Sequence, residues 1–302
     1  MLFNTCCTAA TFRDPEWMKI HAEFHRDLKE RRPEDRGPFP SILDEYWNNR
    51  WKDAPESCNS EYLSAENLHR NHRPWEYIQT LASIYHGRGQ DLRGKRILGL
   101  GAGVESPLWT LSRWGADVTA TDIYFEKKYW HPEFIPHIRG NPEIFCPYHS
   151  AYPVHFRNLN AKIRRLRNLF EWLNLGKYDV AYSISSLEHI HGTQRRERSM
   201  PERIMRKKIS MFRRIARHVA AGGILCFTTE LIVTRGEKRR LDFYERADIE
   251  RIVAELGKCS IELIEPVDWA SCAEQAIPTR GMEGCTHTAL ALTFRRAGSR
   301  SV

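Results

Sequence analysis

Three alternating glycines between a short apolar run and a predicted helix constrain the fold of this chain more than any other feature. The glycines are Gly99, Gly101 and Gly103, and Asp122 follows nineteen positions after the last of them. Hydrophobic periodicity predicts a strand, a helix and a second strand around this turn, over residues 96–101, 106–115 and 118–122. A strand, a glycine turn, a helix and a strand that ends on an acid together predict a Rossmann-like crevice.

Each part of this crevice has a physical reason to bind an adenosine-containing cofactor. Glycines lack a Cβ atom, so the backbone passes close under a ligand. The N-terminus of the next helix presents free N–H groups and the positive end of its dipole. The carboxylate of Asp122 is placed to accept hydrogen bonds from both hydroxyls of a ribose. We therefore expect an adenosine-type cofactor above the glycine turn.

Predicted strands and helices alternate after the turn. The expected strands cover residues 154–159, 178–186, 224–231, 261–264 and 286–295, and the expected helices 160–173, 200–219 and 246–256. This alternation predicts a doubly wound α/β sheet with helices on both faces. The aromatic-rich first part of the chain predicts a helical extension, with helices over 15–32 and 64–85. We expect two parts, an N-terminal helical cap over 1–90 and a cofactor-binding domain over 91–302.

The net charge of +8 comes from one segment of the chain. Residues 156–217 hold sixteen Lys and Arg against five Asp and Glu, whereas the remainder holds 30 against 33. Such a concentration of positive charge is able to bind phosphate groups, and nucleic acid is one candidate partner. A solvated outer helix without a partner explains the same charges.

Cysteine usage and apolar runs bear on the cellular compartment. The eight cysteines are scattered without a C-x-x-C pair, so we expect reduced thiols and no metal site. No apolar run approaches the roughly 20 residues that span a bilayer. The N-terminus has neither a basic region nor a long apolar region of the kind that signal peptides carry. We expect a cytoplasmic location.

Three blocks of sequence resemble class I S-adenosylmethionine-dependent methyltransferases. They are Asp91-Leu-Arg-Gly-Lys-Arg-Ile-Leu-Gly-Leu-Gly-Ala-Gly103, Lys177-Tyr-Asp-Val-Ala-Tyr-Ser-Ile-Ser-Ser-Leu-Glu-His-Ile190 and Gly222-Gly-Ile-Leu-Cys-Phe-Thr-Thr-Glu230. The resemblance implies a seven-stranded sheet with the last strand antiparallel, and S-adenosyl-L-methionine as the cofactor. A dinucleotide oxidoreductase is disfavoured because its fingerprint needs a glycine at the position of Ser106.

The chain departs from the family pattern at three positions. Gly99 stands where the family usually has Asp or Glu. Glu105 replaces a third glycine and is able to cap the following helix. The acid expected after the third strand, which receives the adenine amino group, is absent. Asn160 is the nearest candidate, because an amide oxygen accepts the same hydrogen bond.

The resemblance assigns roles to residues at the carboxyl ends of the predicted strands. Those expected to bind cofactor are Gly99, Gly101, Ala102, Gly103, Glu105, Asp122, Ile123, Asn160 and Ser185. His189 and His191 follow the fourth strand and are candidate general bases, because a neutral imidazole accepts a hydroxyl proton near pH 7. Glu230 ends the fifth predicted strand and is a candidate for binding the acceptor.

These features favour a methyltransferase that acts on an oxygen of a small-molecule or carbohydrate acceptor. Two alternatives remain open from the sequence. One is an RNA or protein methyltransferase that uses the basic segment 156–217. The other is a methyltransferase-like binding module without catalytic activity.

Overall fold

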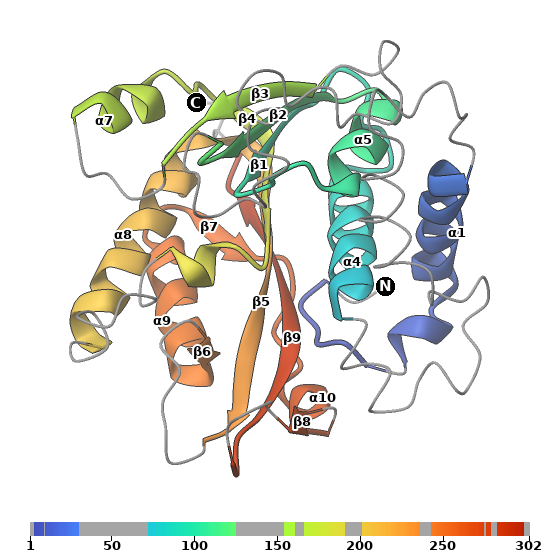
Figure 1. The fold of residues 1–302 in the computed structure, drawn as a ribbon, viewed down its shortest axis with the longest axis vertical. Helices are drawn as coiled ribbons and strands as arrows, with labels where there is room; N and C mark the ends of the chain where they lie inside the picture. Colours follow the sequence, from blue (N-terminus) through green and yellow to red (C-terminus); the bar gives the residue numbers. More distant parts are fainter. Residues whose placement is uncertain are drawn as a thin grey trace.

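The protein forms a doubly wound α/β sheet (Figure 1). A computed structural model describes residues 3–8, 10–29, 72–124, 154–160, 166–190, 201–235, 243–274, 276–278 and 283–298. Seven strands of the sheet follow the order β3-β2-β1-β4-β5-β9-β7, and two short strands pair at its margin. Their bounds are β1 Arg96–Leu100, β2 Asp117–Asp122, β3 Val154–Asn158, β4 Tyr178–Ile184, β5 Val219–Thr234, β6 Tyr244–Glu245, β7 Ile261–Leu263, β8 Ile277–Pro278 and β9 Thr286–Arg296.

Strands β1 to β5 are parallel, and their carboxyl ends share one edge of the sheet. β1 lies inside the sheet, with Gly99 opposite Ala120 of β2 on one side and Tyr182 of β4 on the other. Its last four residues are buried, which matches the continuous apolar run expected of a strand covered on both faces. The reversal of strand order beside β1 places a crevice at the end of this strand.

The last strand, β9, runs antiparallel to both β5 and β7, as predicted. β5 is longer than the sequence predicted, because it continues past Leu231 to Thr234 and stays paired with β9. The ladder between these two strands supplies the hydrogen bonds that keep this extension in strand conformation. The short strands β6 and β8 pair with the same two strands.

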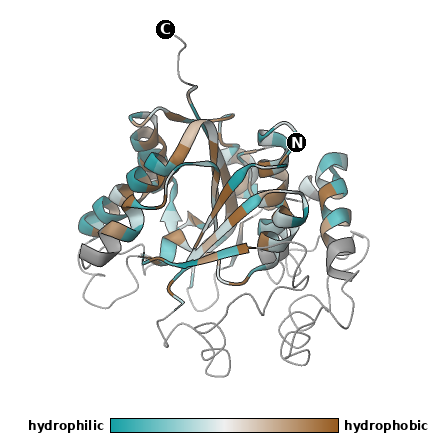
Figure 2. Cartoon of the chain, turned by 90° about the horizontal axis from the view of Figure 1, so that it is seen from above, coloured by the Kyte–Doolittle hydropathy of each residue, from teal (hydrophilic) through white to brown (hydrophobic). Residues whose placement is uncertain are grey.

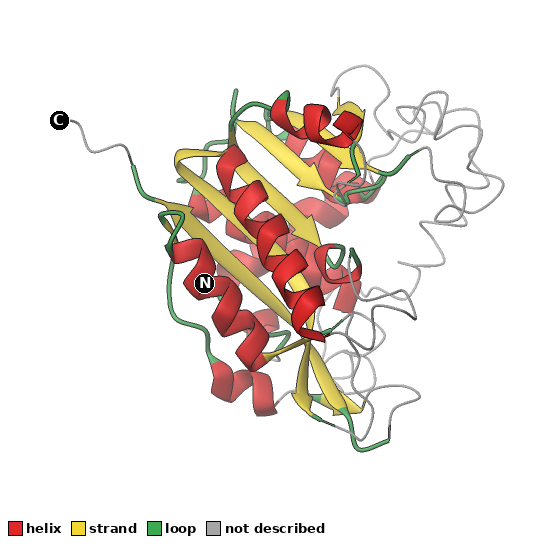
Figure 3. Cartoon of the chain, turned by 90° about the vertical axis from the view of Figure 1, so that its left-hand side faces the viewer, coloured by secondary structure: helices red, strands yellow, loops and turns green. Residues whose placement is uncertain are grey.

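Helices cover both faces of the sheet (Figures 1 and 3). On one face lie α1 Pro15–Lys29, α4 His72–Gly87 and α5 Ser106–Arg113, which share one apolar cluster with the sheet. On the other face lie α7 Leu166–Leu173, α8 Pro201–His218 and α9 Arg246–Gly257, and α10 Trp269–Glu274 belongs to the same second cluster. Apolar residues concentrate in the strands and on the helix faces turned toward them (Figure 2). None of the described helices is long and apolar enough to cross a bilayer.

The N-terminal helices pack directly against the sheet. In α4 every residue from Trp75 to Ile84 is buried, because the helix lies between α1 and strands β4, β5 and β9. Phe24 of α1 meets Tyr77 of α4 edge to face, with ring centroids 6.3 Å apart. The part of the predicted extension over 64–71 lies outside the described residues.

The prediction of reduced, unpaired cysteines is wrong at two positions. Cys6 and Cys272 form a disulfide that joins the N-terminal segment to α10. The backbone brings them together, because the segment around Cys6 runs beside β9: Cys7 N–H donates to Ala289 O at 3.0 Å and Ala291 N–H to Thr5 O at 2.9 Å. The two cysteines are 266 positions apart in the chain, so nothing in the sequence indicated that they are close in space.

Candidate active site at the carboxyl edge of the sheet

The glycine turn directly after β1 adopts the conformation that only glycine tolerates well. Gly101 and Gly103 have φ values of +61° and +52°. A Cβ atom on Gly101 would lie 2.7 Å from the Cβ of Ser186, which excludes any side chain there. Ala102 N–H donates to Thr121 O at 3.1 Å, and the Ser186 hydroxyl donates to Gly101 O at 2.9 Å. The turn is therefore held between β2 and the loop after β4.

Asp122 lies under this turn at the end of β2. Its Oδ2 accepts the Gly103 N–H at 2.9 Å and its Oδ1 accepts the Ile123 N–H at 2.6 Å. Burial raises the pKa of Asp122 to about 6, although both backbone hydrogen bonds act in the opposite direction. The Tyr124 hydroxyl donates to Gly103 O at 2.7 Å and fixes the other side of the turn. Each carboxylate oxygen has two lone pairs, so each is able to accept a second hydrogen bond beside the one from the backbone.

Asn160 is brought to the same edge by β3. Leu159 N–H donates to Asp122 O at 2.9 Å, so the residues after β3 follow the end of β2. Trp172 of α7 donates its indole N–H to Asn160 O at 3.3 Å. Tertiary structure therefore places Asn160 beside Asp122, although 38 positions separate them in the chain.

Ser185 connects the end of β4 to α4. It has a φ of +40°, which is uncommon for a non-glycine residue, and its N–H donates to Thr228 O at 3.2 Å. Its hydroxyl donates to the carboxylate of Glu76, a buried residue of α4. The loop after β4 is thus joined to α4 by a hydrogen bond from Ser185 to a buried carboxylate.

The candidate general base His189 lies in the 3-10 turn Leu187–His189. Its side chain is 46% exposed, and its Nε2 lies 3.9 Å from Oε1 of the fully buried Glu188. His189 therefore follows β4 in the chain and is accessible to solvent. His191 lies outside the described residues.

Glu230 lies inside β5, which corrects the prediction that it ends the strand. Its Oε2 lies 3.6 Å from Nε2 of His287 on β9, and both side chains are largely buried. Burial raises the pKa of the Cys7 thiol, and the charges of Glu76 and Glu230 raise it further. Glu230 therefore shares a polar cluster with α4, β9 and the N-terminal segment.

Gly99 and Glu105 are the two positions of the glycine block at which the chain departs from the family pattern. A Cβ atom on Gly99 would lie 2.8 Å from the Ala102 Cβ and 3.0 Å from the Tyr182 hydroxyl oxygen. Glu105 occupies the N-cap position of α5, but its side chain makes no capping hydrogen bond. The capping role predicted for Glu105 is therefore wrong in this structure.

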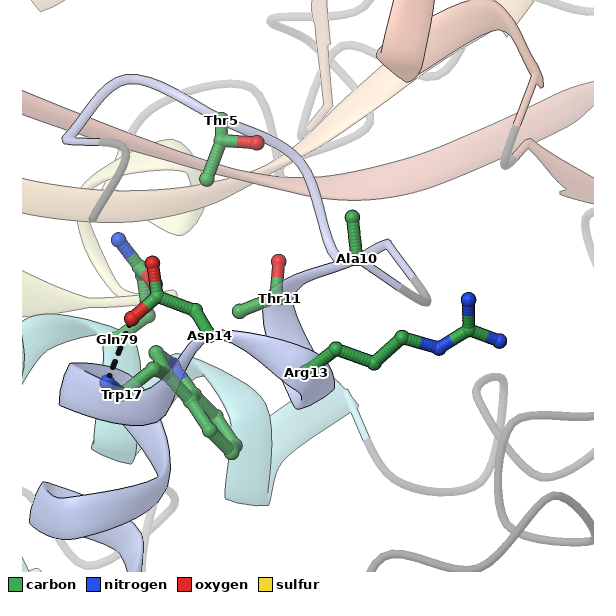
Figure 4. A pocket seen from close by; sticks show the side chains of 7 residues that line it. All are labelled: Thr5, Ala10, Thr11, Arg13, Asp14, Trp17 and Gln79. Atoms are coloured by element: carbon green, nitrogen blue, oxygen red, sulfur yellow. Dashed lines mark hydrogen bonds between the residues drawn. The ribbon is translucent and has the colours of Figure 1, made fainter.

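A cavity of about 360 Å³ lies between the N-terminal segment, α1 and α4. Figure 4 shows residues from all three, with Thr5 above and Trp17 below. The residues that line the cavity are Thr5, Ala10, Thr11, Arg13, Asp14, Trp17 and Gln79. Asp14 caps α1 here, because its Oδ1 accepts the N–H of Trp17 at 3.0 Å.

Three basic side chains of the segment 156–217 contact an aromatic ring or an acidic side chain of the same chain. Lys208 of α8 is buried, and its ammonium lies 4.2 Å from the ring centroid of Tyr244. Arg214 lies 5.2 Å from the ring centroid of Trp172, and Arg213 forms an ion pair with Glu255. Lys208 is therefore engaged within the fold, whereas Arg213 is exposed.

Among the residues that the structure describes, four that the sequence did not single out border the site. They are Glu76, Tyr182, Ser186 and His287. Only Tyr182 had any signal in the sequence, since a glycine at position 99 indicates that something else fills the space. Ser186 adjoins the predicted Ser185, but its hydrogen bond to Gly101 O is a tertiary contact. Glu76 and His287 come from elements whose placement beside the crevice is a tertiary property.

Comparisons with known proteins give low similarity throughout. No protein-family model and no curated protein matches the chain. Magnesium protoporphyrin IX methyltransferase from Synechocystis PCC 6803, solved with bound SAH, is 16% identical, covers 85% of this chain and 100% of its own, and has a TM-score of 0.47. An S-adenosylmethionine-dependent methyltransferase from Clostridium acetobutylicum is 10% identical, covers 85% of this chain and 100% of its own, and has a TM-score of 0.44. The [4+2]-cyclase SpnF is 15% identical, covers 68% of this chain and 76% of its own, and has a TM-score of 0.39.

The fold follows from the strand order of the chain itself. The central path β3-β2-β1-β4-β5-β9-β7 has seven strands, and β9 is antiparallel to both its neighbours. This is the sheet that the sequence resemblance implies, with the glycine turn after β1. The chain has the fold of the class I S-adenosylmethionine-dependent methyltransferases.

Proposed function

We propose that this protein is an S-adenosylmethionine-dependent methyltransferase that methylates an oxygen of a small-molecule or carbohydrate acceptor. The observation that carries the proposal is the Asp122 carboxylate, which accepts two backbone N–H bonds beneath a glycine turn. Burying this charge raises its pKa and is therefore unfavourable for folding. A costly charge at the ligand edge of a doubly wound sheet marks a functional site.

In this proposal the cofactor lies across the carboxyl edge of the sheet. Asp122 accepts the ribose hydroxyls with its remaining lone pairs, Asn160 and Ile123 border the adenine, and the backbone from Gly101 to Gly103 passes beneath the ligand. The bound cofactor supplies an electrophilic methyl group on a sulfonium, so the residues of this chain have to position the acceptor and manage its proton. Ser185, held by Glu76, shapes the edge where donor and acceptor meet.

His189, His191 and Glu230 are the candidates for handling the acceptor. His189 is half-exposed in the turn after β4, and Glu230 lies beside His287 in a largely buried pair. We assign residues 1–90 to a cap over the acceptor side and 91–302 to the cofactor-binding domain. The bond between Ser185 and Glu76 supports this assignment, because it joins the cap to the loop after β4.

Calorimetric titration with S-adenosylmethionine and S-adenosylhomocysteine tests the proposal. We expect saturable binding of both ligands to the wild-type protein, and loss of binding in Asp122→Ala. Absence of binding at near-millimolar ligand would contradict the proposal and favour a non-catalytic module. Binding of RNA with a steep salt dependence would instead move the acceptor to nucleic acid.

A further inference from the structure

Helices α7 and α8 form one outer surface of the molecule. Both lie on the left-hand side of Figure 1, which is the side that faces the viewer in Figure 3. Trp172 of α7 joins them, because its ring centroid lies 5.5 Å from that of His218 and 5.2 Å from the guanidinium of Arg214. Side chains on the solvent side of these two helices therefore share one surface.

The solvent side of α8 carries a stripe of cations. Four basic residues follow one another at steps of four, seven and three positions, so they lie on one face of the helix. They are Arg203, Lys207, Arg214 and Arg217. The buried residues of α8 lie on the opposite face, which packs on the sheet. At a rise of 1.5 Å per residue the stripe is about 21 Å long.

Acids do little to neutralise this stripe from within α8. The sequence of the helix contains one acid, Glu202, and this acid is paired with Arg251 of α9 at 3.0 Å. Burial lowers the pKa of Arg214, and the charge of Arg217 lowers it further. Like charges therefore lie close enough together along the stripe to repel one another.

The positive charge continues past the end of α8. The ammonium of Lys177, in the turn before β4, donates a hydrogen bond to Arg217 O. Burial lowers the pKa of His218, a hydrogen bond with Gly176 O raises it, and the charges of Lys177, Arg214 and Arg217 lower it further. Three cations thus surround the end of α8, where they would stabilise a bound anion.

Two large apolar side chains are exposed on the neighbouring helix. Phe170 is 60% exposed and Leu173 is 67% exposed, and they are the large apolar side chains that stand out in solvent within the described part of the chain. They are three positions apart and therefore lie on one face of α7. Leu173 directly follows Trp172, the residue against which Arg214 packs. Adjacent exposed apolar groups bordered by charges mark an interaction surface.

We infer that this surface of α7 and α8 attaches the protein to the surface of a membrane that contains anionic lipids. Lys and Arg side chains are attracted to the negative headgroups of such a membrane. Phe and Leu side chains enter the boundary between the headgroups and the acyl chains. A nucleic acid would use the cations of the stripe but would leave Leu173 in water, so a membrane fits the surface better.

Sedimentation with lipid vesicles tests this inference. We expect the wild-type protein to bind phosphatidylcholine vesicles that contain phosphatidylserine at least about tenfold more tightly than vesicles of phosphatidylcholine alone. Arg217→Gln should weaken binding to the anionic vesicles by about fivefold, and the double variant Arg203→Gln/Arg217→Gln by about 25-fold. Phe170→Gln/Leu173→Gln should weaken it by about tenfold. Gln is a good helix former, and thermal unfolding checks that each variant is folded.

Arg235→Gln is the matched control. It removes one exposed cation at the far end of β5 from Arg217, where the side chain is paired with Glu245 at 3.7 Å. The net charge changes by the same amount as in Arg217→Gln, but the stripe is intact. We expect binding to the anionic vesicles within about twofold of wild type.

Three outcomes would overturn the inference. One is equal binding of wild type to vesicles with and without phosphatidylserine. Another is a loss in Arg235→Gln as large as that in Arg217→Gln, or no loss in Phe170→Gln/Leu173→Gln. The third is tight, salt-sensitive binding of a single-stranded RNA that depends on Arg217 while vesicles are not bound, which would assign the surface to nucleic acid. Each outcome leaves the proposed function unaffected, because vesicle binding is measured without cofactor.

Discussion

Replacing Asp122 with Asn should separate the stability of this protein from its ability to bind ligand. Burial raises the pKa of Asp122 from its ordinary value of 3.8 to about 6. At pH 7 the ionised group therefore lowers the free energy of unfolding by about 3 kcal/mol relative to its neutral form. Asn is neutral and nearly isosteric, so Asp122→Asn relieves this cost. It also loses one of the two backbone hydrogen bonds, which is worth about 1–2 kcal/mol.

The net expectation is a variant that is more stable than wild type by about 1–2 kcal/mol at pH 7. The pH dependence is the sharper test. The folded state binds more protons than the unfolded state between pH 3.8 and about 6, so the contribution of Asp122 to stability falls as pH rises through this window. Lowering the pH from 7 to 4.5 should stabilise wild type relative to the variant by about 2 kcal/mol.

Urea unfolding of both proteins at pH 7, 6, 5 and 4.5 measures this difference. Taking the difference between the two proteins removes the other carboxylates, such as Asp14 and Asp268, whose lowered pKa values act with the opposite sign. A difference in unfolding free energy that stays constant over this range would falsify the assignment of a raised pKa to Asp122. Calorimetry on the same samples should show weakened S-adenosylhomocysteine binding in the more stable variant.

Two further predictions concern the frame of the site. Gly101→Ala places a Cβ atom 2.7 Å from the Ser186 Cβ at a φ of +61°, so we expect urea unfolding to show a loss of about 2–4 kcal/mol. An unchanged midpoint would contradict this geometry. Replacing Cys6 and Cys272 by Ser removes a crosslink between positions 266 apart in the chain and should lower the free energy of unfolding by about 5–6 kcal/mol on chain entropy. Dithiothreitol should have the same effect on wild type and none on the double variant; equal sensitivity of both proteins would exclude the bond in solution.

The sequence alone determined the core of the fold because its signals there are local. The short run Ile97–Leu100 is largely apolar and leads into Gly101 and Gly103, and β1 with the turn after it forms as predicted. The extent of β5 was not predictable in the same way. Its residues beyond Leu231 are held as a strand by pairing with β9, more than 50 positions later in the chain. The disulfide between Cys6 and Cys272 has the same origin, since neither cysteine has a neighbour in sequence that reveals its partner.

The candidate site also contains residues that the sequence predicted and residues that only tertiary packing brings there. Periodicity placed Asp122, Asn160, Ser185 and His189 at strand ends, and the sheet brings those strand ends to one edge. The side chains that contact these residues could be identified only from the packing of the helices against the sheet. Glu76 reaches Ser185 because α4 lies against β4.

The sequence showed that position 99 lacked its usual acid, and the tertiary structure showed why. Tyr182 lies over Gly99 because β4 pairs with β1 in a register that sets them opposite each other. The sequence gives the identity of each side chain, whereas the space available to it depends on its neighbours on the adjacent strands. The sequence determined that this chain forms a glycine turn and a doubly wound sheet. Only the tertiary structure decided which groups surround that turn, because the chain segments that supply them meet only when the sheet is assembled.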